Sequence, residues 1–111
     1  MTDTKQALQQ AKSRLAAIAQ ASPEIMKGFA AVSKTATREG RLSSGQKELM
    51  AVVAAVVKGC DDCILYHVDA AKRHGVDQDT LIEALEVAIE MGGGPAVMYA
   101  GKALEAFRGL N

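Results

Sequence analysis

The sequence lacks an excess of charge of either sign and has no long hydrophobic run. Its 111 residues include 13 Lys or Arg and 13 Asp or Glu, so the formal net charge is zero. Nucleic-acid-binding proteins normally carry a basic excess that neutralises phosphates, so we expect no nucleic-acid partner. The longest apolar run, Leu49–Val57, is far shorter than the roughly 18 residues of a membrane-spanning helix. The polar segment Met1–Gln6 has no apolar signal-peptide core, so we expect a cytoplasmic protein without a membrane partner.

Patterns typical of strand pairs, internal repeats, linkers and low-complexity tracts are also missing. The composition is 49% hydrophobic and 23% charged, which argues against intrinsic disorder. The length fits one domain over residues 1–111. Because the apolar residues recur at helical spacing nearly everywhere, the sequence predicts an all-α, single-domain bundle of about six helices. A small, half-apolar chain without net charge is also a plausible oligomer subunit.

Two helices are predicted in the first third of the chain. Apolar residues spaced three and four apart predict the first over residues 3–20. Ser22 offers an N-cap oxygen and Pro23 suits the first position of the second helix, which should end before Gly40. The apolar stripe of this second helix consists of Ile25, Phe29, Val32 and Ala36.

A third helix is predicted over residues 43–58. Ser43–Gln46 forms a capping box at its start, and Gly59 suits a left-handed cap at its end. Its run Leu49–Val57 is apolar all round, which places this helix at the centre of the bundle or of an oligomer.

Glycines separate the three remaining helices. The fourth should start near Cys60–Asp62 and run to Gly75. Asp77 is placed to cap a fifth helix, which the segment Gly92–Pro95 stops. Pro95 then opens the sixth helix.

The only two cysteines, Cys60 and Cys63, precede His67 by seven and four residues. On a helix this spacing puts all three on one face, with neighbouring Cβ atoms about 5–6 Å apart. That is close enough for a disulfide and for the imidazole to take a thiol proton. A helix N-terminus and a nearby base both favour the reactive thiolate. The cluster therefore predicts thiol redox chemistry.

Other interpretations of the cysteines remain open. They could form a structural disulfide, although so short a loop contributes only about 2 kcal/mol. They could be two buried, inert core residues. They could bind zinc together with His67 and Glu48, whereas His74 lies about 21 Å along the helix from Cys60 and cannot share the ion. A thioredoxin-like enzyme would need a βαβ pattern, which the sequence does not have.

Glu48 is the candidate partner of His67. If the third and fourth helices form an antiparallel hairpin at Gly59, Glu48 lies eleven residues before the turn and His67 eight after it. The offset of three residues corresponds to about 5 Å of rise, so the two side chains would lie at nearly the same level. Glu48 could then orient His67, and His67 could act on Cys63. The alternative is a first-turn acid that only favours the helix dipole.

The complete spacing resembles the signature of AhpD-like alkylhydroperoxidases, which belong to the carboxymuconolactone decarboxylase superfamily. The pattern consists of Glu48, eleven residues, Cys60-x-x-Cys63, three residues and His67. The segment Gly92–Tyr99 also resembles small members of that group. The resemblance covers roughly residues 20–107.

This resemblance implies an all-helical subunit of a homotrimer or homohexamer that reduces hydroperoxides in antioxidant defence, without a cofactor or metal. Cys63 would be the peroxidatic thiol and Cys60 the resolving one. His67 and Glu48 would form the proton relay. An external dithiol or a lipoyl-bearing adaptor would restore the reduced pair.

The first of two further features departs from the family pattern, and the second concerns which cysteine is the nucleophile. Asp61 and Asp62 place carboxylates between the cysteines, where nearby negative charge raises a thiol pKa, unless they simply cap the helix. The helix N-terminus favours ionisation of Cys60, whereas His67 favours Cys63. The alternative functions are a carboxymuconolactone decarboxylase, whose chemistry needs no CxxC pair, and a non-enzymatic redox sensor.

Overall fold

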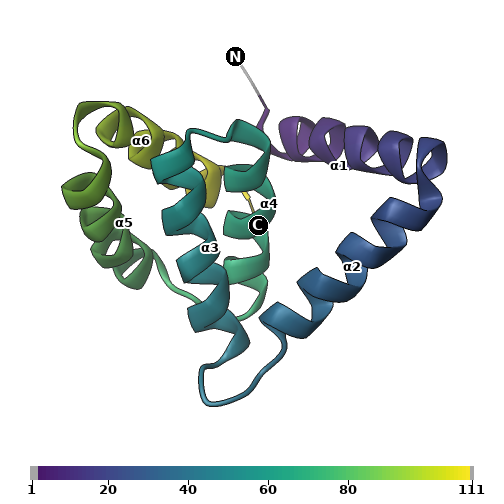
Figure 1. Cartoon of the computed structure of the whole chain (residues 1–111). Helices are drawn as coiled ribbons and strands as arrows, with labels where there is room; N and C mark the ends of the chain where they lie inside the picture. The colour runs from purple at the N-terminus through teal and green to yellow at the C-terminus, as the bar shows by residue number, and fades with distance from the viewer. Residues whose placement is uncertain (1–2, 111) are drawn as a thin grey trace.

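The computed structural model describes residues 3–110; Met1 and Thr2, part of the polar N-terminal segment considered above, lie outside the described residues, as does Asn111. This part of the chain contains six helices and no strand, which confirms the predicted all-α class (Figure 1). The helices are α1 (Thr4–Ala21), α2 (Pro23–Thr37), α3 (Ser44–Lys58), α4 (Asp61–Arg73), α5 (Gln78–Gly92) and α6 (Gly94–Gly109). None of the helices in residues 3–110 combines the length and hydropathy needed to cross a membrane.

Local signals define most helix ends as predicted. The capping box forms at α3, where the Ser43 side chain accepts from the Gln46 N–H and the Gln46 side chain accepts from the Ser43 N–H. Gly59 ends α3 in the left-handed region, at φ 73°. The Asp77 carboxylate caps α5 by accepting from the Thr80 N–H at 2.8 Å, and this bond lowers the pKa of Asp77. The expected Ser22 cap is wrong: Ser22 occupies the N-cap position of α2, but its side chain makes no capping hydrogen bond.

The hydrophobic core packs against α3, but the apolar run predicted to be central is not covered on every side, since Met50 and Val57 are 54% and 44% exposed. Helices α4, α5 and α6 all pack against α3. The largest fully buried side chains are Val52 and Val56 of α3, Ile64 and Val68 of α4, and Leu81 of α5. This arrangement makes α3 and α4 an antiparallel pair that turns at Gly59 (Figure 1).

Helices α1 and α2 form a V whose closed end points away from this core (Figure 1). Only Leu8 and Ala11 of α1 are buried, and no residue of α2 is buried. The stripe predicted for the second helix is present as a pattern, but Ile25, Phe29 and Val32 are 72%, 59% and 66% exposed. Since α2 packs only against α1 and α3, the core of a single chain does not cover its apolar face.

Candidate active site

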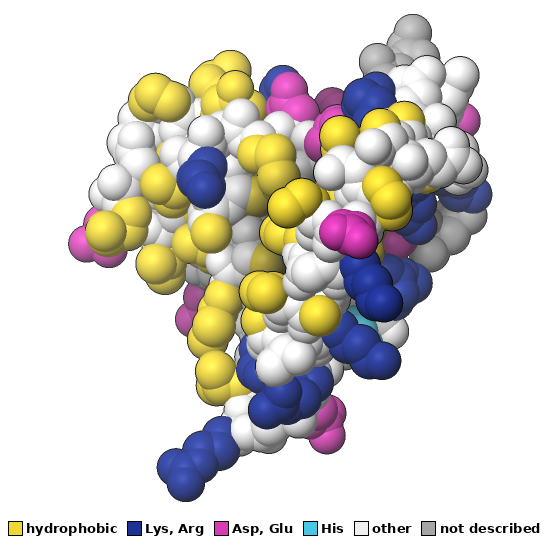
Figure 2. All heavy atoms as spheres, turned by 45° about the vertical axis from the view of Figure 1, so that its right-hand side comes forward, with side chains coloured by type: hydrophobic (Ala, Val, Ile, Leu, Met, Phe, Trp, Pro, Cys, Tyr) yellow, Lys and Arg dark blue, Asp and Glu magenta, His cyan; other side chains and the backbone are white. Residues whose placement is uncertain are grey.

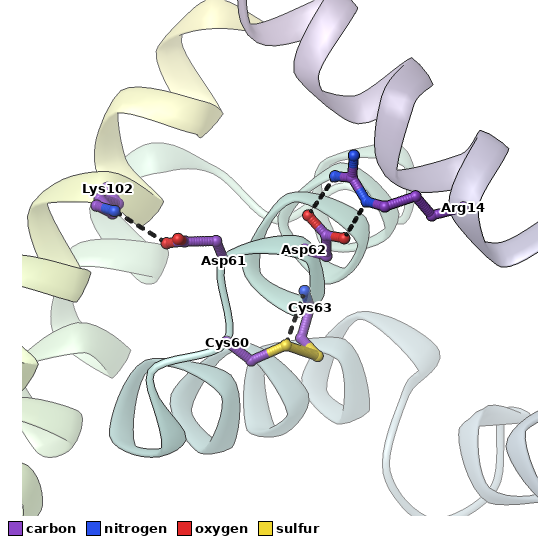
Figure 3. Close-up of polar contacts among 6 residues, drawn as sticks. All are labelled: Arg14, Cys60, Asp61, Asp62, Cys63 and Lys102. Atoms are coloured by element: carbon purple, nitrogen blue, oxygen red, sulfur yellow. Dashed lines mark hydrogen bonds and ion pairs between the residues drawn. A yellow bond between two sulfur atoms is a disulfide. The ribbon is translucent and has the colours of Figure 1, made fainter.

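Cys60 and Cys63 lie at the N-terminus of α4, directly after the turn at Gly59. They are joined in a disulfide, with Cα atoms 5.2 Å apart. Cys60 is the N-cap residue, and its Sγ accepts a hydrogen bond from the backbone N–H of Cys63 at 3.2 Å (Figure 3). The prediction that Asp61 or Asp62 caps this helix is therefore wrong. A sulfur atom takes the position of the usual capping oxygen, which puts Cys60 at the positive end of the helix dipole.

Glu48 and His67 are brought together by the antiparallel pairing of α3 and α4, as the hairpin register predicts. Glu48 is only 7% exposed and is the one buried charged residue in the described part of the chain. Its Oε1 lies 2.6 Å from Nδ1 of His67. An ionised carboxylate can only accept, so His67 donates from Nδ1 and its Nε2 remains able to take a proton.

An open cleft of about 1120 Å³ lies between α1, α2 and α4. Cys63 and His67 both line it, together with Tyr66, whose ring stands edge-on to that of His67 at a centroid distance of 5.3 Å. Cys60 is not among the residues that line the cleft in the described chain. The sulfur accessible from the cleft is therefore that of Cys63.

The cleft is lined by apolar side chains and by cations. Apolar side chains from α1 and α2 include Leu15, Ile18, Met26 and Phe29, and the cations are Lys12, Arg14, Lys27 and Lys34. Figure 2, which brings this side of the molecule forward, shows Lys and Arg side chains gathered on its right and lower part and hydrophobic side chains over much of the remainder. Cys63 therefore lies in a cleft whose lining includes a group of apolar side chains.

Each aspartate between the cysteines is held by a cation from another helix (Figure 3). Lys102 of α6 lies 3.0 Å from Asp61. Arg14 of α1 binds both oxygens of Asp62, from Nη2 at 2.8 Å and from Nε at 2.9 Å. The hydrogen bonds to Arg14 lower the pKa of Asp62, and Asp62 in turn raises the pKa of Arg14. Sequence inspection missed Arg14 and Lys102 because they lie 48 and 41 residues from their partners.

The zinc interpretation receives no support from the geometry of residues 3–110. No group of three or more His, Cys, Asp or Glu side chains there converges on a common point suitable for a metal ion. His74 takes a different position, as the C-cap of α4 at the opposite end of the helix from the cysteines.

Comparison with known sequences identifies relatives over nearly the whole chain. The profile of the Carboxymuconolactone decarboxylase family matches residues 23–106. An uncharacterized protein of Cupriavidus necator is 48% identical over 110 residues, covering 99% of this chain and 97% of the relative. An uncharacterized protein of the cox locus of Paracoccus denitrificans is 38% identical over 94 residues, covering 85% of each.

Solved structures share the fold. A carboxymuconolactone decarboxylase family protein of Legionella pneumophila superimposes with a TM-score of 0.91 and 37% identity, covering 96% of both chains. A Thermotoga maritima protein of the same family has a TM-score of 0.82 and 28% identity, covering 92% of this chain and 87% of its own. A part in the antioxidative response has been suggested for the Thermotoga protein.

Proposed function

From the premise that this chain belongs to the carboxymuconolactone decarboxylase family, we propose that it is an AhpD-like, thiol-dependent alkyl hydroperoxide reductase. One observation carries the proposal: His67, paired with the buried Glu48, and one sulfur of a CxxC disulfide, that of Cys63, line the same cleft. In this combination His67 is the base, Glu48 is the group that orients it and Cys63 is the nucleophile. The antioxidative role suggested for the Thermotoga relative adds support.

The oxidative half of the reaction begins with the reduced pair. His67 takes the proton of the Cys63 thiol, and the buried Glu48 carboxylate stabilises the imidazolium. The Cys63 thiolate attacks one oxygen of the hydroperoxide; an S–O bond forms and the O–O bond breaks. His67 returns its proton to the leaving oxygen, so the products are an alcohol and a Cys63 sulfenic acid. The Cys60 thiol then condenses with the sulfenic acid, which releases water and forms the disulfide.

The reductive half needs an external dithiol, either free or carried by a lipoyl-bearing adaptor. Its thiolate attacks the accessible Cys63 sulfur, and Cys60 leaves as a thiolate at the N-cap position, where the N–H of Cys63 and the helix dipole stabilise it. The second thiol of the reductant resolves the mixed disulfide. A cytoplasmic location, where dithiols are kept reduced, fits this cycle.

Turnover with a defined dithiol tests the proposal. We expect the protein to consume an organic hydroperoxide for many cycles when dihydrolipoamide is supplied, because the disulfide can then be reduced repeatedly. Hydroperoxide loss and dithiol oxidation should be measured together, with a Cys60→Ser/Cys63→Ser variant as the blank. Slow, stoichiometric thiol loss without turnover would indicate a redox sensor instead, and no thiol loss at all would exclude both functions.

We also propose that the subunits assemble as homotrimers or homohexamers, and that the exposed stripe on α2 lies in the interface. Burial of its apolar side chains against another copy would remove them from water. Light scattering after size-exclusion chromatography should give the mass of three or six chains for the wild type. Ile25→Glu should yield smaller species, because it places a charge in the stripe at a side chain that is 72% exposed and is not among those that line the cleft in the described chain. Ala31→Glu puts the same charge on an exposed position of α2 outside the stripe and should leave the mass unchanged; equal behaviour of the two variants would contradict the proposed interface.

A further inference from the structure

Asp62 is the one carboxylate among the described residues that line the cleft at Cys63. It directly precedes Cys63 in the chain, and its oxygens are both occupied by the guanidinium of Arg14. Arg14 lines the same cleft, whereas Asp61 and Lys102 are not among its lining residues in the described chain. Figure 3 shows Asp62 on the helical turn that carries Cys63, with its carboxylate pointing toward Arg14 of α1, and the Asp61–Lys102 pair on the other side of that turn. The Arg14–Asp62 pair therefore lies at the cleft that Cys63 lines, and the Asp61–Lys102 pair does not.

A carboxylate next to a thiol opposes formation of the thiolate, because two negative charges then lie close together. The other titratable and charged side chains of the cleft are Lys12, Arg14, Lys27, Lys34, Tyr66 and His67, with Glu48 buried behind His67. The positive charges of these lysines and of Arg14 favour the thiolate form of Cys63. Asp62 is the exception at the cleft, and within residues 3–110 the hydrogen bonds to its carboxylate come only from Arg14.

We propose that Arg14 is a positioning residue for the redox pair: by holding the Asp62 carboxylate in a bidentate ion pair, it prevents that charge from suppressing the thiolate form of Cys63. This inference rests on the proposed thiol chemistry of Cys63. It gives α1 a part in the reactivity of the cysteines and the Glu48–His67 pair, which α3, α4 and the turn between them carry. It also explains how this chain tolerates an acidic residue beside its nucleophile.

A purely structural role, in which Arg14 only fastens α1 to α4, makes a different prediction. Arg73 controls for the loss of an exposed arginine–aspartate ion pair on α4, because its Nε binds Asp69 of the same helix at 3.0 Å. The two arginine side chains are similarly exposed, 61% for Arg14 and 59% for Arg73. If Arg14 only fastens α1 to α4, Arg14→Gln should leave the ionisation of the Cys63 thiol unchanged, and Arg73→Gln should do the same.

The test measures the alkylation of Cys63 by iodoacetamide as a function of pH in a Cys60→Ser background. This background leaves one thiol in the chain, and the introduced serine retains a side-chain acceptor at the N-cap. Arg14→Gln should slow alkylation near neutral pH about three- to tenfold and move the midpoint of the curve to higher pH. Asp62→Asn should move the midpoint to lower pH, and the double variant should return it close to the parent. Arg73→Gln should leave the curve unchanged.

Two results would overturn the inference. One is an Arg14→Gln midpoint equal to that of Arg73→Gln. The other is a lower rate at the high-pH plateau with an unchanged midpoint, because Arg14 would then control access rather than ionisation. Since alkylation involves no peroxide, an absence of peroxidase turnover in every variant would reject the proposed function while the midpoint shift still supported the part assigned to Arg14.

Discussion

Reduced Cys60→Ser protein should acquire a sulfenic or more highly oxidised product at Cys63 when it is treated with one equivalent of organic hydroperoxide. Wild type should instead lose two hydrogen atoms, because its Cys60 thiol converts the sulfenic acid to the disulfide. Cys63→Ser should remain unoxidised over the same period. Intact-mass spectrometry distinguishes all three products in one experiment. The expectation follows from the cleft, which contains Cys63 and His67 but not Cys60 among its described lining residues.

The opposite result has a physical basis and would be equally informative. Cys60 accepts the backbone hydrogen bond at the N-cap of α4, an arrangement that stabilises a thiolate there. A thiolate stabilised in this way is a good leaving group, which suits a resolving cysteine during reduction of the disulfide. Oxidation of Cys63→Ser but not of Cys60→Ser would keep the redox function and reverse the two roles. Serine preserves an acceptor at the cap, so the comparison is not confounded by loss of the helix start.

The fold was predictable because its signals are local. The capping box at Ser43–Gln46, the left-handed Gly59 and the Asp77 cap each act within a few residues, so the sequence alone locates those helix ends. The pairing of Glu48 with His67 was predictable for a related reason. Once two helices turn at Gly59, helical rise alone fixes which residues lie at the same level.

The features that escaped prediction depend on how distant segments meet. Nothing in the sequence relates Arg14 to Asp62, because the direction in which α1 leaves the core is set by the packing of Leu8 and Ala11. The exposure of the apolar stripe on α2, which includes Phe29, could not be predicted either. Helical periodicity shows that a helix has an apolar face, but it does not show whether the same chain covers that face.

Substitution of His67 should cause the largest loss of activity outside the cysteines. In His67→Gln, no side chain can take the Cys63 proton and return it to the leaving oxygen, so peroxide-dependent oxidation of the thiol should slow about 10²- to 10⁴-fold. The other histidine, His74, caps the far end of α4 and serves as the control. His74→Gln should retain wild-type rates, measured by single-turnover thiol loss.

Glu48→Gln separates orientation of the imidazole from stabilisation of its charge. The amide oxygen of the introduced glutamine can still accept the Nδ1–H of His67, so the ring should keep its position at the cleft. The negative charge that stabilises the imidazolium is removed, and we expect a loss intermediate between those of wild type and His67→Gln. Glu48→Leu also removes the acceptor and should approach the His67→Gln rate. If Glu48→Gln and wild type oxidise at the same rate, the buried carboxylate only positions the ring, and Cys63 would have to rely on the helix N-terminus and the cleft cations for its ionisation.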